Sequence, residues 1–209
     1  MSPSNTIRVM IADDHSIVRQ GLATLIEQEP DMTVVAQARD GNEAIALFRQ
    51  HQPDVALMDL RMPNVDGVTA ITTICAESSQ AQIMVLTTFD GDEDIYRGLR
   101  AGAKGYLLKD AEPDELLNAI RTINRGQKHI PPAVGAKLAE RMTNPDLSDR
   151  ELEVIRLIAL GKSNHDISTD LNISESTVKF HINRILGKLG VSDRTQAVIV
   201  ALKRGMASL

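Results

Sequence analysis

The chain has 209 residues, 43% hydrophobic and 24% charged, a composition typical of a globular protein long enough for two domains. Its longest clean apolar run, residues 197–202, falls far short of the roughly 20 residues that cross a bilayer. The polar N-terminus lacks an apolar signal core, so we expect no membrane segment and a cytoplasmic location. The single cysteine, Cys75, has no intrachain disulfide partner and lies in an apolar pattern that favours a buried thiol.

The net charge of −5 is unevenly distributed along the chain. Residues 1–125 hold 11 Lys and Arg against 19 Asp and Glu, whereas residues 126–145 carry a net +2 and residues 146–209 a net +1. The acidic surplus argues against a nucleic-acid contact in the first part. The C-terminal part permits such a contact, although +1 is too small to count as a basic patch.

Five β-branched or aliphatic runs recur about every 25 residues in the first 125 residues, each followed by apolar residues at helical spacing. The runs are residues 7–12, 32–38, 55–58, 83–86 and 105–108. This alternation predicts an α/β fold, namely a doubly wound (βα)5 domain whose parallel sheet is covered by helices on both faces. A site is expected beyond the carboxyl ends of the strands, at the topological switch point.

Polar side chains follow four of the five predicted strands. Asp13 and Asp14 follow the first, Asp59 the third and Thr87 the fourth, while the fifth runs to Lys109. Converging carboxylates repel one another unless a cation neutralises them, and oxygen ligands suit a hard ion such as Mg²⁺. Asp59 is then the expected nucleophile that forms an acyl phosphate. The metal and Lys109 would offset charge on the transferring group, and Thr87 would hydrogen-bond a phosphoryl oxygen.

Each of these residues has a simpler explanation when it is taken alone. An acidic pair after a strand is usually a solvated loop, and a single lysine is usually a solvated charge, so the prediction depends on their joint occurrence. An aspartyl-phosphate phosphatase or transferase would use the same nucleophile and metal. Haloacid-dehalogenase-like enzymes, however, have a second carboxylate two residues after the nucleophile, where this chain has Arg61. His15 is interpreted as a supporting loop residue because the expected ion prefers oxygen.

Residues 7–125 resemble the receiver domain of bacterial two-component response regulators, on the motifs Asp13-Asp14-His15, Asp59-Leu-Arg-Met-Pro63, Thr87 and Lys109. The resemblance implies a flavodoxin-like parallel sheet of order 2-1-3-4-5, and it implies that a sensor histidine kinase supplies the phosphoryl group. It also implies a Mg²⁺ site in which Asp14, Asp59 and the backbone carbonyl of Arg61 are direct ligands and Asp13 acts through water.

Two further features bear on this resemblance. In the family, the threonine and an aromatic residue shift inward after phosphorylation, which corresponds here to Thr87 and Tyr106; simple core packing is the alternative for Tyr106. Many receivers carry a proline after the lysine, whereas Asp110 follows Lys109 here. A cis bond at that position would cost about 2.5 to 4 kcal/mol without proline.

Residues 126–146 are predicted to form an interdomain linker with a short helix, because Gly126 follows the last helical pattern and prolines bracket a brief amphipathic stretch. The sequence does not decide whether this linker leaves the domains free or docks them.

The sequence of residues 147–209 predicts four helices. Ser148 and Glu151 form a capping box, and Ser174 begins a third helix that reaches Leu189. Helix, short turn and longer helix predict a helix-turn-helix.

The third of these helices has a buried stripe and a free face. Val178, Ile182, Ile185 and Leu189 recur at helical spacing and form the stripe. The residues that point away from it are Ser176, Lys179, Phe180 and Asn183. Lysine and asparagine can donate to base edges or phosphates, and an outward helix fits the major groove. Residues placed for flanking phosphate contacts are Ser176, Thr177, His181, Arg184, Lys188 and Arg194. Core packing for Phe180 and a solvated face for the lysines are the alternatives.

Residues 147–204 are similar to the DNA-binding domain of LuxR-type regulators, and the whole chain resembles the NarL/FixJ subfamily of response regulators. The stretches that carry the resemblance are residues 161–164, 173–181 and 188–194. The family's base contacts fall on Lys179, Phe180 and Asn183. Family members often have basic residues in the second helix where this chain has Asp166 and Asp170.

The combined expectation is a transcription factor controlled by phosphorylation of Asp59. It is not expected to be an enzyme, apart from Mg²⁺-dependent self-phosphorylation from a phosphodonor and slow self-dephosphorylation. It would bind double-stranded DNA and form a phosphorylation-dependent homodimer. A receiver that has lost phosphorylation control and binds DNA constitutively is the alternative. The presence of Asp14, Asp59, Thr87 and Lys109 together argues against that alternative.

Overall fold

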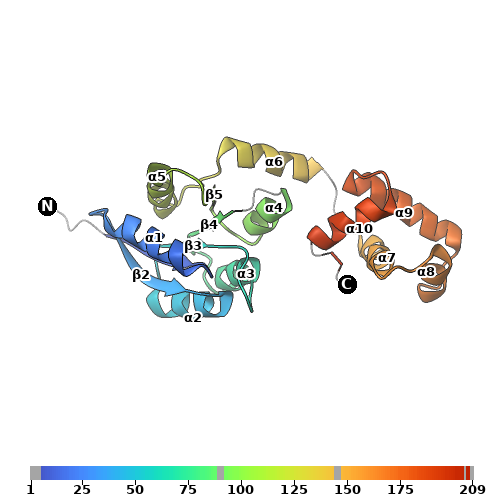
Figure 1. Cartoon of the computed structure of the whole chain (residues 1–209), viewed down its shortest axis with the longest axis horizontal. Coiled ribbons are helices and arrows are strands. Elements are labelled where there is room, and N and C mark those ends of the chain that lie inside the picture. Colours follow the sequence, from blue (N-terminus) through green and yellow to red (C-terminus); the bar gives the residue numbers. More distant parts are fainter. Residues whose placement is uncertain (1–5, 89–91, 144–146, 205, 208–209) are drawn as a thin grey trace. The chain divides into compact units, whose positions relative to one another are not determined.

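The computed structural model describes residues 6–88, 92–143, 147–204 and 206–207. The chain divides into two compact units, residues 1–138 and 139–209, which are described separately (Figure 1). Within the described residues there is no cis peptide bond, so the bond between Lys109 and Asp110 is trans. No helix in this part of the chain is long and apolar enough to cross a membrane.

The N-terminal unit contains a five-stranded parallel sheet of order β2-β1-β3-β4-β5, which confirms the predicted topology. The strands are β1 (Ile7–Ala12), β2 (Met32–Ala38), β3 (Val55–Met58), β4 (Ile83–Thr87) and β5 (Gly105–Leu108). The chain reverses its direction of winding between β1 and β3, which pair directly. The residues that follow these two strands therefore meet at one crevice.

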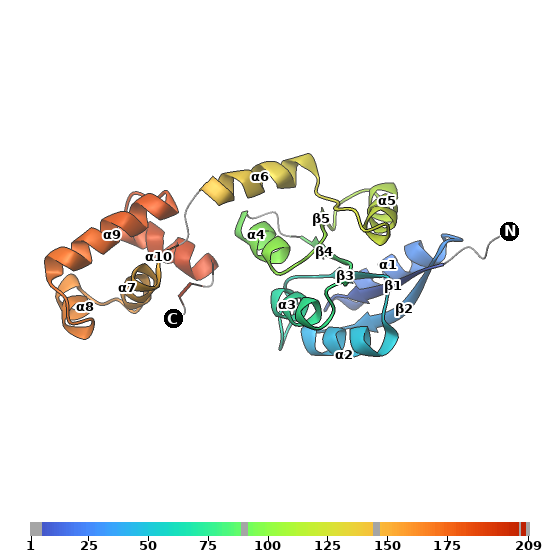
Figure 2. The ribbon, with the colours of Figure 1, turned by 180° about the vertical axis from the view of Figure 1, so that it is seen from behind.

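Helices cover both faces of this sheet, as Figures 1 and 2 show. On one face lie α1 (Ser16–Glu27) and α5 (Pro113–Asn124), packed on Val9, Ile11 and Leu57. On the other lie α2 (Gly41–His51), α3 (Gly67–Glu77) and α4 (Asp92–Arg100), packed on Met10 and Met58. Successive strand residues point to opposite faces, so burial on both faces explains why the strands read as continuous apolar runs.

The helix α6 (Pro132–Thr143) crosses the division between the two units. Its first part belongs to the N-terminal unit, because Val134 is buried in the same cluster as Tyr106, with Ile130 and Leu138 packed against it. Just before the helix, His129 forms a parallel bridge with Gly105, and its carbonyl accepts a hydrogen bond from Tyr106 N at 3.0 Å. Much of the segment predicted as a linker therefore packs on the edge of this sheet.

The C-terminal unit consists, within the described residues, of α7 (Asp149–Ala159), α8 (Asn164–Asp170), α9 (Glu175–Leu189) and α10 (Arg194–Lys203), together with the end of α6. The predicted capping box of Ser148 and Glu151 is present, and the Ser174 hydroxyl caps α9 by accepting from Thr177 N. Val178, Ile185 and Leu189 are buried in its core, with Ile182 packed against it.

Cys75 lies in α3 and is half-buried, less enclosed than the buried thiol that its apolar pattern predicts. Burial raises the pKa of its thiol, and the nearby charge of Lys104 offsets only part of that effect. The residue is therefore a structural thiol with low nucleophilicity at neutral pH.

Candidate functional site

Backbone hydrogen bonds continue the parallel sheet beyond the ends of its strands and so fix the residues of the site. Asp59 N donates to Ala12 O at 2.8 Å, and Asp13 N donates to Ala38 O at 3.1 Å. At the other side of the crevice, Lys109 N donates to Thr87 O at 2.9 Å. The acidic and basic side chains are thus attached to a rigid edge rather than to free loops.

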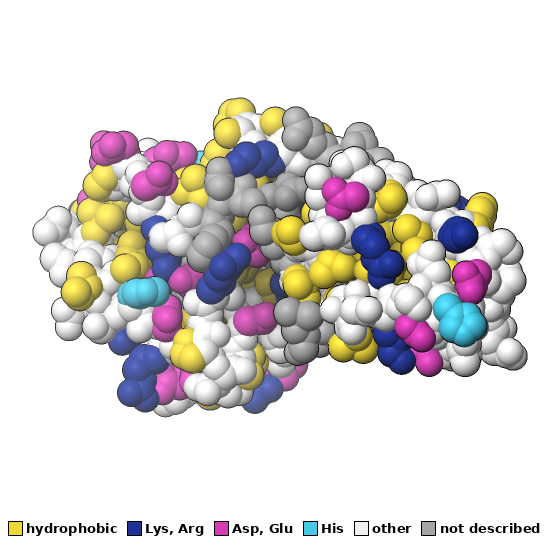
Figure 3. Space-filling model, turned by 45° about the vertical axis from the view of Figure 1, so that its right-hand side comes forward, with side chains coloured by type: hydrophobic (Ala, Val, Ile, Leu, Met, Phe, Trp, Pro, Cys, Tyr) yellow, Lys and Arg dark blue, Asp and Glu magenta, His cyan; other side chains and the backbone are white. Residues whose placement is uncertain are grey.

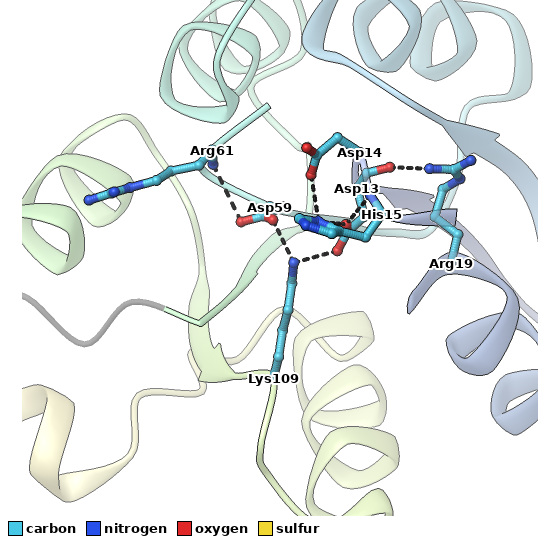
Figure 4. Close-up of polar contacts among 7 residues, drawn as sticks. All are labelled: Asp13, Asp14, His15, Arg19, Asp59, Arg61 and Lys109. Carbon is cyan, nitrogen blue, oxygen red and sulfur yellow. Dashed lines mark hydrogen bonds and ion pairs between the residues drawn. The ribbon is translucent and has the colours of Figure 1, made fainter. Parts of the chain in front are cut away.

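The ammonium of Lys109 lies between two carboxylates, as Figure 4 shows. Its Nζ is 2.5 Å from Asp59 Oδ2 and 2.6 Å from Asp13 Oδ2. Asp13 and Asp59 are only 2% and 4% exposed, so these charges are largely shielded from water. Burial alone would lower the pKa of Lys109, but its hydrogen bonds and ion pairs with the two carboxylates outweigh burial and raise it.

The loop after β1 is held by its neighbours. The backbone N of His15 donates to Asp13 Oδ1 at 2.8 Å, and the His15 ring Nδ1 lies 2.8 Å from Asp14 Oδ1. Arg19 of α1 donates to the carbonyl of Asp13 at 2.5 Å. The support from Arg19 was not predicted. Its place directly after Val18 in the helical pattern of α1 gives no indication of a contact with a residue six positions earlier. These contacts orient the two aspartates around the crevice (Figure 4).

Thr87 ends β4 beside this crevice, and its side chain is fully buried. Its Oγ1 has no hydrogen-bond partner among the described protein atoms. A buried hydroxyl without a partner is costly, and such groups concentrate at functional sites. Tyr106 of β5 is also fully buried, in a cluster with Ile95 of α4 and Val134 of α6.

The donor set of the crevice fits a divalent cation. Asp13, Asp14, His15 and Asp59 each offer a ligand atom, and these atoms all lie within 4.8 Å of one another. Three of the four residues are carboxylates, which suit Mg²⁺. The side chain of Arg61 points away from this cluster and pairs with Asp94 at 3.2 Å, while its backbone N is 3.4 Å from Asp59 Oδ1 (Figure 4).

A second candidate surface is the outward face of α9. Lys179, Phe180 and Asn183 are all exposed, as their spacing predicts, and Phe180 keeps 55% of its surface exposed. The guanidinium carbon of Arg184 lies 5.6 Å from the centre of the Phe180 ring, and the His181 ring meets that ring edge-on at 5.7 Å. Polar groups and an aromatic ring thus share one helix face.

The predicted flanking residues have different surroundings. Ser176 and Thr177 make hydroxyl contacts with the capping Ser174, at 2.7 and 2.8 Å. The half-buried His181 has a buried Nδ1 without a hydrogen-bond partner in the described structure. Arg194 is exposed but donates to Lys162 O at 2.9 Å.

Lys188 differs most from its predicted setting, because its Nζ lies 2.6 Å from Oε2 of the buried Glu151. The sequence interpretation assigned Glu151 only to a helix cap. Its place one and two turns before Ile155 and Ile158 on α7 could have indicated burial. On the face shown in Figure 3, Lys and Arg side chains are interspersed with acidic ones, in agreement with the small net charge of the C-terminal part.

Comparisons with known proteins identify a family for each of the two units. Residues 9–121 match the family described as response regulator receiver domain, and residues 145–201 match bacterial regulatory proteins of the LuxR family. The chain is 44% identical to the transcriptional regulatory protein YxjL of Bacillus subtilis, over 96% of this chain and 97% of that protein. It is 43% identical to the transcriptional regulatory protein LiaR of the same organism, over 93% and 96%.

Solved structures extend the likeness to the fold of the whole chain. RcsB from Salmonella enterica serovar Typhimurium, bound to the promoter P1flhDC in the presence of the phosphomimetic BeF3⁻, has a TM-score of 0.76 and 30% identity. The match covers 93% of this chain and 97% of that one. One family therefore contains both units of the chain, the receiver-like unit first and the helical unit second. The chain belongs to the response regulators with a receiver domain and a LuxR-type DNA-binding domain, the NarL/FixJ subfamily, which regulate transcription.

Proposed function

We propose that Asp59 accepts a phosphoryl group from a sensor histidine kinase and that this controls binding of α9 to promoter DNA. The observation that carries the proposal is the buried carboxylate of Asp59, held beside Asp13 and 2.5 Å from the ammonium of Lys109. A phosphoryl group needs a nucleophile and nearby positive charge, and little other chemistry from the protein.

Asp13, Asp14, Asp59 and the backbone carbonyl of Arg61 would hold Mg²⁺, with Asp13 acting through water. When bound, the ion would neutralise charge on the phosphoryl oxygens and on the carboxylates. The fit rests on the carboxylate cluster, whose ligand atoms are within 4.8 Å of one another.

In the transfer step, a carboxylate oxygen of Asp59 forms a bond to phosphorus while the bond between phosphorus and the donor breaks. The donor keeps the electrons of the broken bond, and the product is an acyl phosphate. Lys109 is placed to pair with a phosphoryl oxygen instead of the Asp59 carboxylate. The hydroxyl of Thr87, which has no partner among the described atoms, is free to donate to another phosphoryl oxygen.

Output would pass through Thr87 and Tyr106 to the DNA-binding domain. Tyr106 contacts the same cluster as Val134 of α6, so a movement of the tyrosine would reach the segment that leads to the second domain. The phosphorylated protein would form a homodimer in the cytoplasm. Its two α9 helices would then enter major grooves about one helical turn apart on a roughly palindromic site.

On α9, Lys179, Phe180 and Asn183 would contact base edges. The flanking residues proposed for the DNA backbone are Ser176, Thr177, His181, Arg184 and Arg194. Lysine and asparagine supply donors, and an exposed apolar ring suits the methyl group of thymine.

The proposal is tested by incubating the protein with acetyl phosphate and Mg²⁺ and measuring its mass and its affinity for a DNA duplex at fixed salt. The wild-type protein should gain one phosphoryl group and bind more tightly. Asp59→Ala should gain no phosphoryl group and show no acetyl-phosphate-dependent binding. If acetyl phosphate still raised the DNA affinity of Asp59→Ala as it does for the wild type, the proposed switch would be contradicted. If Lys179→Met bound the duplex as tightly as the wild type, the proposed reading face would be contradicted.

A further inference from the structure

Two cations on α9 converge on one buried carboxylate of α7. Glu151 is 1% exposed, and its Oε2 lies 2.6 Å from Nζ of Lys188. Its Oε1 lies 3.4 Å from Nε of Arg184, one helical turn earlier on α9. The side chain of Lys188 is itself only 17% exposed. This cluster therefore joins the two helices inside the domain.

The carboxylate is fixed from its own side of the cluster as well. Glu151 occupies the third position of α7, where its Oε2 accepts from Ser148 N at 2.8 Å to complete the capping box. The positive end of the α7 dipole favours an anion there, and the negative end of the α9 dipole favours Lys188 in its last turn. Burial alone would raise the pKa of Glu151, but Lys188 and Ser148 lower it overall, so the carboxyl is charged at neutral pH.

Lys188 cannot leave this pair without a large cost. A buried carboxylate that loses its cation is left uncompensated in a poorly hydrated site, whereas a phosphate contact made at the surface competes with water and salt. Because the side chain of Lys188 is only 17% exposed, an ammonium that stays with Glu151 has little surface to offer a phosphate. Its contribution to DNA binding would then be made through the orientation of α9.

Arg184 extends the cluster to the reading face. Its guanidinium pairs with Glu151 on one side and lies over the ring of Phe180 on the other, at 5.6 Å from the ring centre. A planar cation above an aromatic ring is attracted by the ring's quadrupole. The buried carboxylate is thus linked, through one side chain, to an exposed residue of the face that is proposed to read bases.

We infer that Glu151 is a positioning residue for DNA recognition, which holds α9 through Lys188 and Arg184, and that Lys188 is not a phosphate contact. The inference rests on the proposed role of α9 in DNA binding. It replaces the sequence-based expectation that Lys188 contacts the DNA backbone. It also gives the acidic residue at the start of α7 a part in sequence selectivity rather than in capping alone.

The test uses the full chain and two duplexes of equal length, one selected from a random library by the wild-type protein and one with the same bases scrambled. Affinity is measured over a range of salt concentrations for wild type, Lys188→Met, Glu151→Gln and the double variant. Each lost phosphate contact should reduce the slope of log affinity against log salt by about 0.9. We expect Lys188→Met to keep the wild-type slope and to lose about tenfold in affinity for the selected duplex only.

Glu151→Gln should behave in the same way, and the double variant should lose no more than either single variant because both act through one pair. A slope reduced by about 0.9 in Lys188→Met would overturn the inference. The inference would also be overturned if the variants lost the same affinity for both duplexes and this loss matched the unfolded fraction measured by circular dichroism. That pattern would indicate a role in stability alone.

A second measurement needs no variant. Lysine acylation of the wild-type protein, followed by mass spectrometry, should modify Lys188 slowly with and without the selected duplex, and should modify Lys179 rapidly only when DNA is absent. Rapid acylation of Lys188 that the duplex prevents would overturn the inference. A failure of the proposed function is distinguishable, because the wild-type protein would then select no duplex and Lys179 would not be protected.

Discussion

The ammonium of Lys109 lies 2.5 Å from Asp59 Oδ2, although 50 positions separate the two residues in the chain. The same ammonium contacts Asp13, so in this structure one cation compensates two buried carboxylates. A divalent ion at the same crevice would take over part of that role. The two cations are therefore expected to compete for the charge of Asp59.

Replacing Lys109 with methionine should make the receiver depend on Mg²⁺ for its stability. Without the ion, the variant should lose on the order of 3 kcal/mol of unfolding free energy, because a buried ion pair loses one partner. Added Mg²⁺ should stabilise the variant more than the wild type. Urea unfolding followed by tyrosine fluorescence measures this selectively, since both tyrosines, Tyr96 and Tyr106, lie in the N-terminal unit and the chain has no tryptophan.

The control for this prediction is Lys128→Met, which removes an exposed lysine outside the crevice. Its stability and its response to Mg²⁺ should match those of the wild type. An equal response to Mg²⁺ in all three proteins would contradict the expected competition between Lys109 and the ion.

Replacing Thr87 with valine should separate stability from phosphorylation. The hydroxyl of Thr87 is buried and has no partner in the described structure, so its removal should leave the unphosphorylated protein as stable as the wild type or about 1 kcal/mol more stable. The acyl phosphate should form to a lower level, because a donor to the phosphoryl oxygen is lost. Thr72→Val, on the exposed side of α3, should change neither property. A marked loss of stability in Thr87→Val would mean that the hydroxyl is already satisfied.

Two glycine substitutions should have opposite effects on the receiver. A Cβ at Gly67, at the start of α3, would lie 1.9 Å from the carbonyl oxygen of Asp59, so Gly67→Ala should displace the loop that carries Asp59 and cost about 1 to 3 kcal/mol. At Gly21, inside α1, such a Cβ would meet no atom within 4 Å apart from its chain neighbours and the backbone of its own helix, and Gly21→Ala should stabilise by about 1 kcal/mol. Urea unfolding and acetyl phosphate labelling measure both. Normal labelling of Gly67→Ala would show that the loop tolerates the displacement.

The first part of α6 should contribute to the stability of the receiver. Val134→Asp buries a charge in the cluster that contains Tyr106 and should cost on the order of 3 kcal/mol. Ala136→Asp, on the exposed side of the same helix, should cost less than 1 kcal/mol by helix propensity. Tyrosine-monitored urea unfolding compares the two. Equal costs would mean that the helix does not pack on the receiver in solution.

Acid should weaken the C-terminal domain through Glu151. Its pKa in the folded protein is below the ordinary value of 4.5, because Lys188 and Ser148 outweigh the effect of burial. The carboxylate therefore contributes full stability above pH 4.5, and this contribution is lost as the pH falls through the lowered pKa. Thermal unfolding by circular dichroism between pH 3 and 6 should show a smaller decline in Glu151→Gln than in the wild type. Parallel declines would assign the acid sensitivity to other carboxylates.

The strands and the helix caps could be predicted because they depend on local patterns, whereas the order of the strands was expected from the resemblance to receiver domains. The apolar runs mark the strands, and the side chains of Asp13, Asp59 and Lys109 are brought together by topology once the sheet order is known. Serine and aspartate caps are satisfied within three residues, so Ser148 and Ser174 could be assigned from sequence alone.

The remainder depends on contacts between distant segments. The pairing of Lys188 with Glu151 joins residues 37 positions apart, and the periodicity of α9 gives no indication that this lysine turns inward. The pairing of His129 with Gly105 on β5 could not be predicted either. Its segment, which lies before α6, was interpreted as part of a linker. Pattern alone cannot distinguish a free connector from one that packs on a neighbouring sheet.

The bridge between His129 and Gly105 has a consequence for the construction of chimeric regulators. β5 is one of the two outer strands of the sheet, and an uncovered outer strand offers free backbone groups to other chains. A receiver that ends at residue 125 would lack His129 and would leave Gly105 of β5 without this pairing. Such a receiver is expected to aggregate through pairing of its exposed strand edges. Fusions to other output domains should therefore be joined after Leu138. Insertions at that point should keep to the 3.6-residue repeat of α6, so that the same helix face stays directed inward.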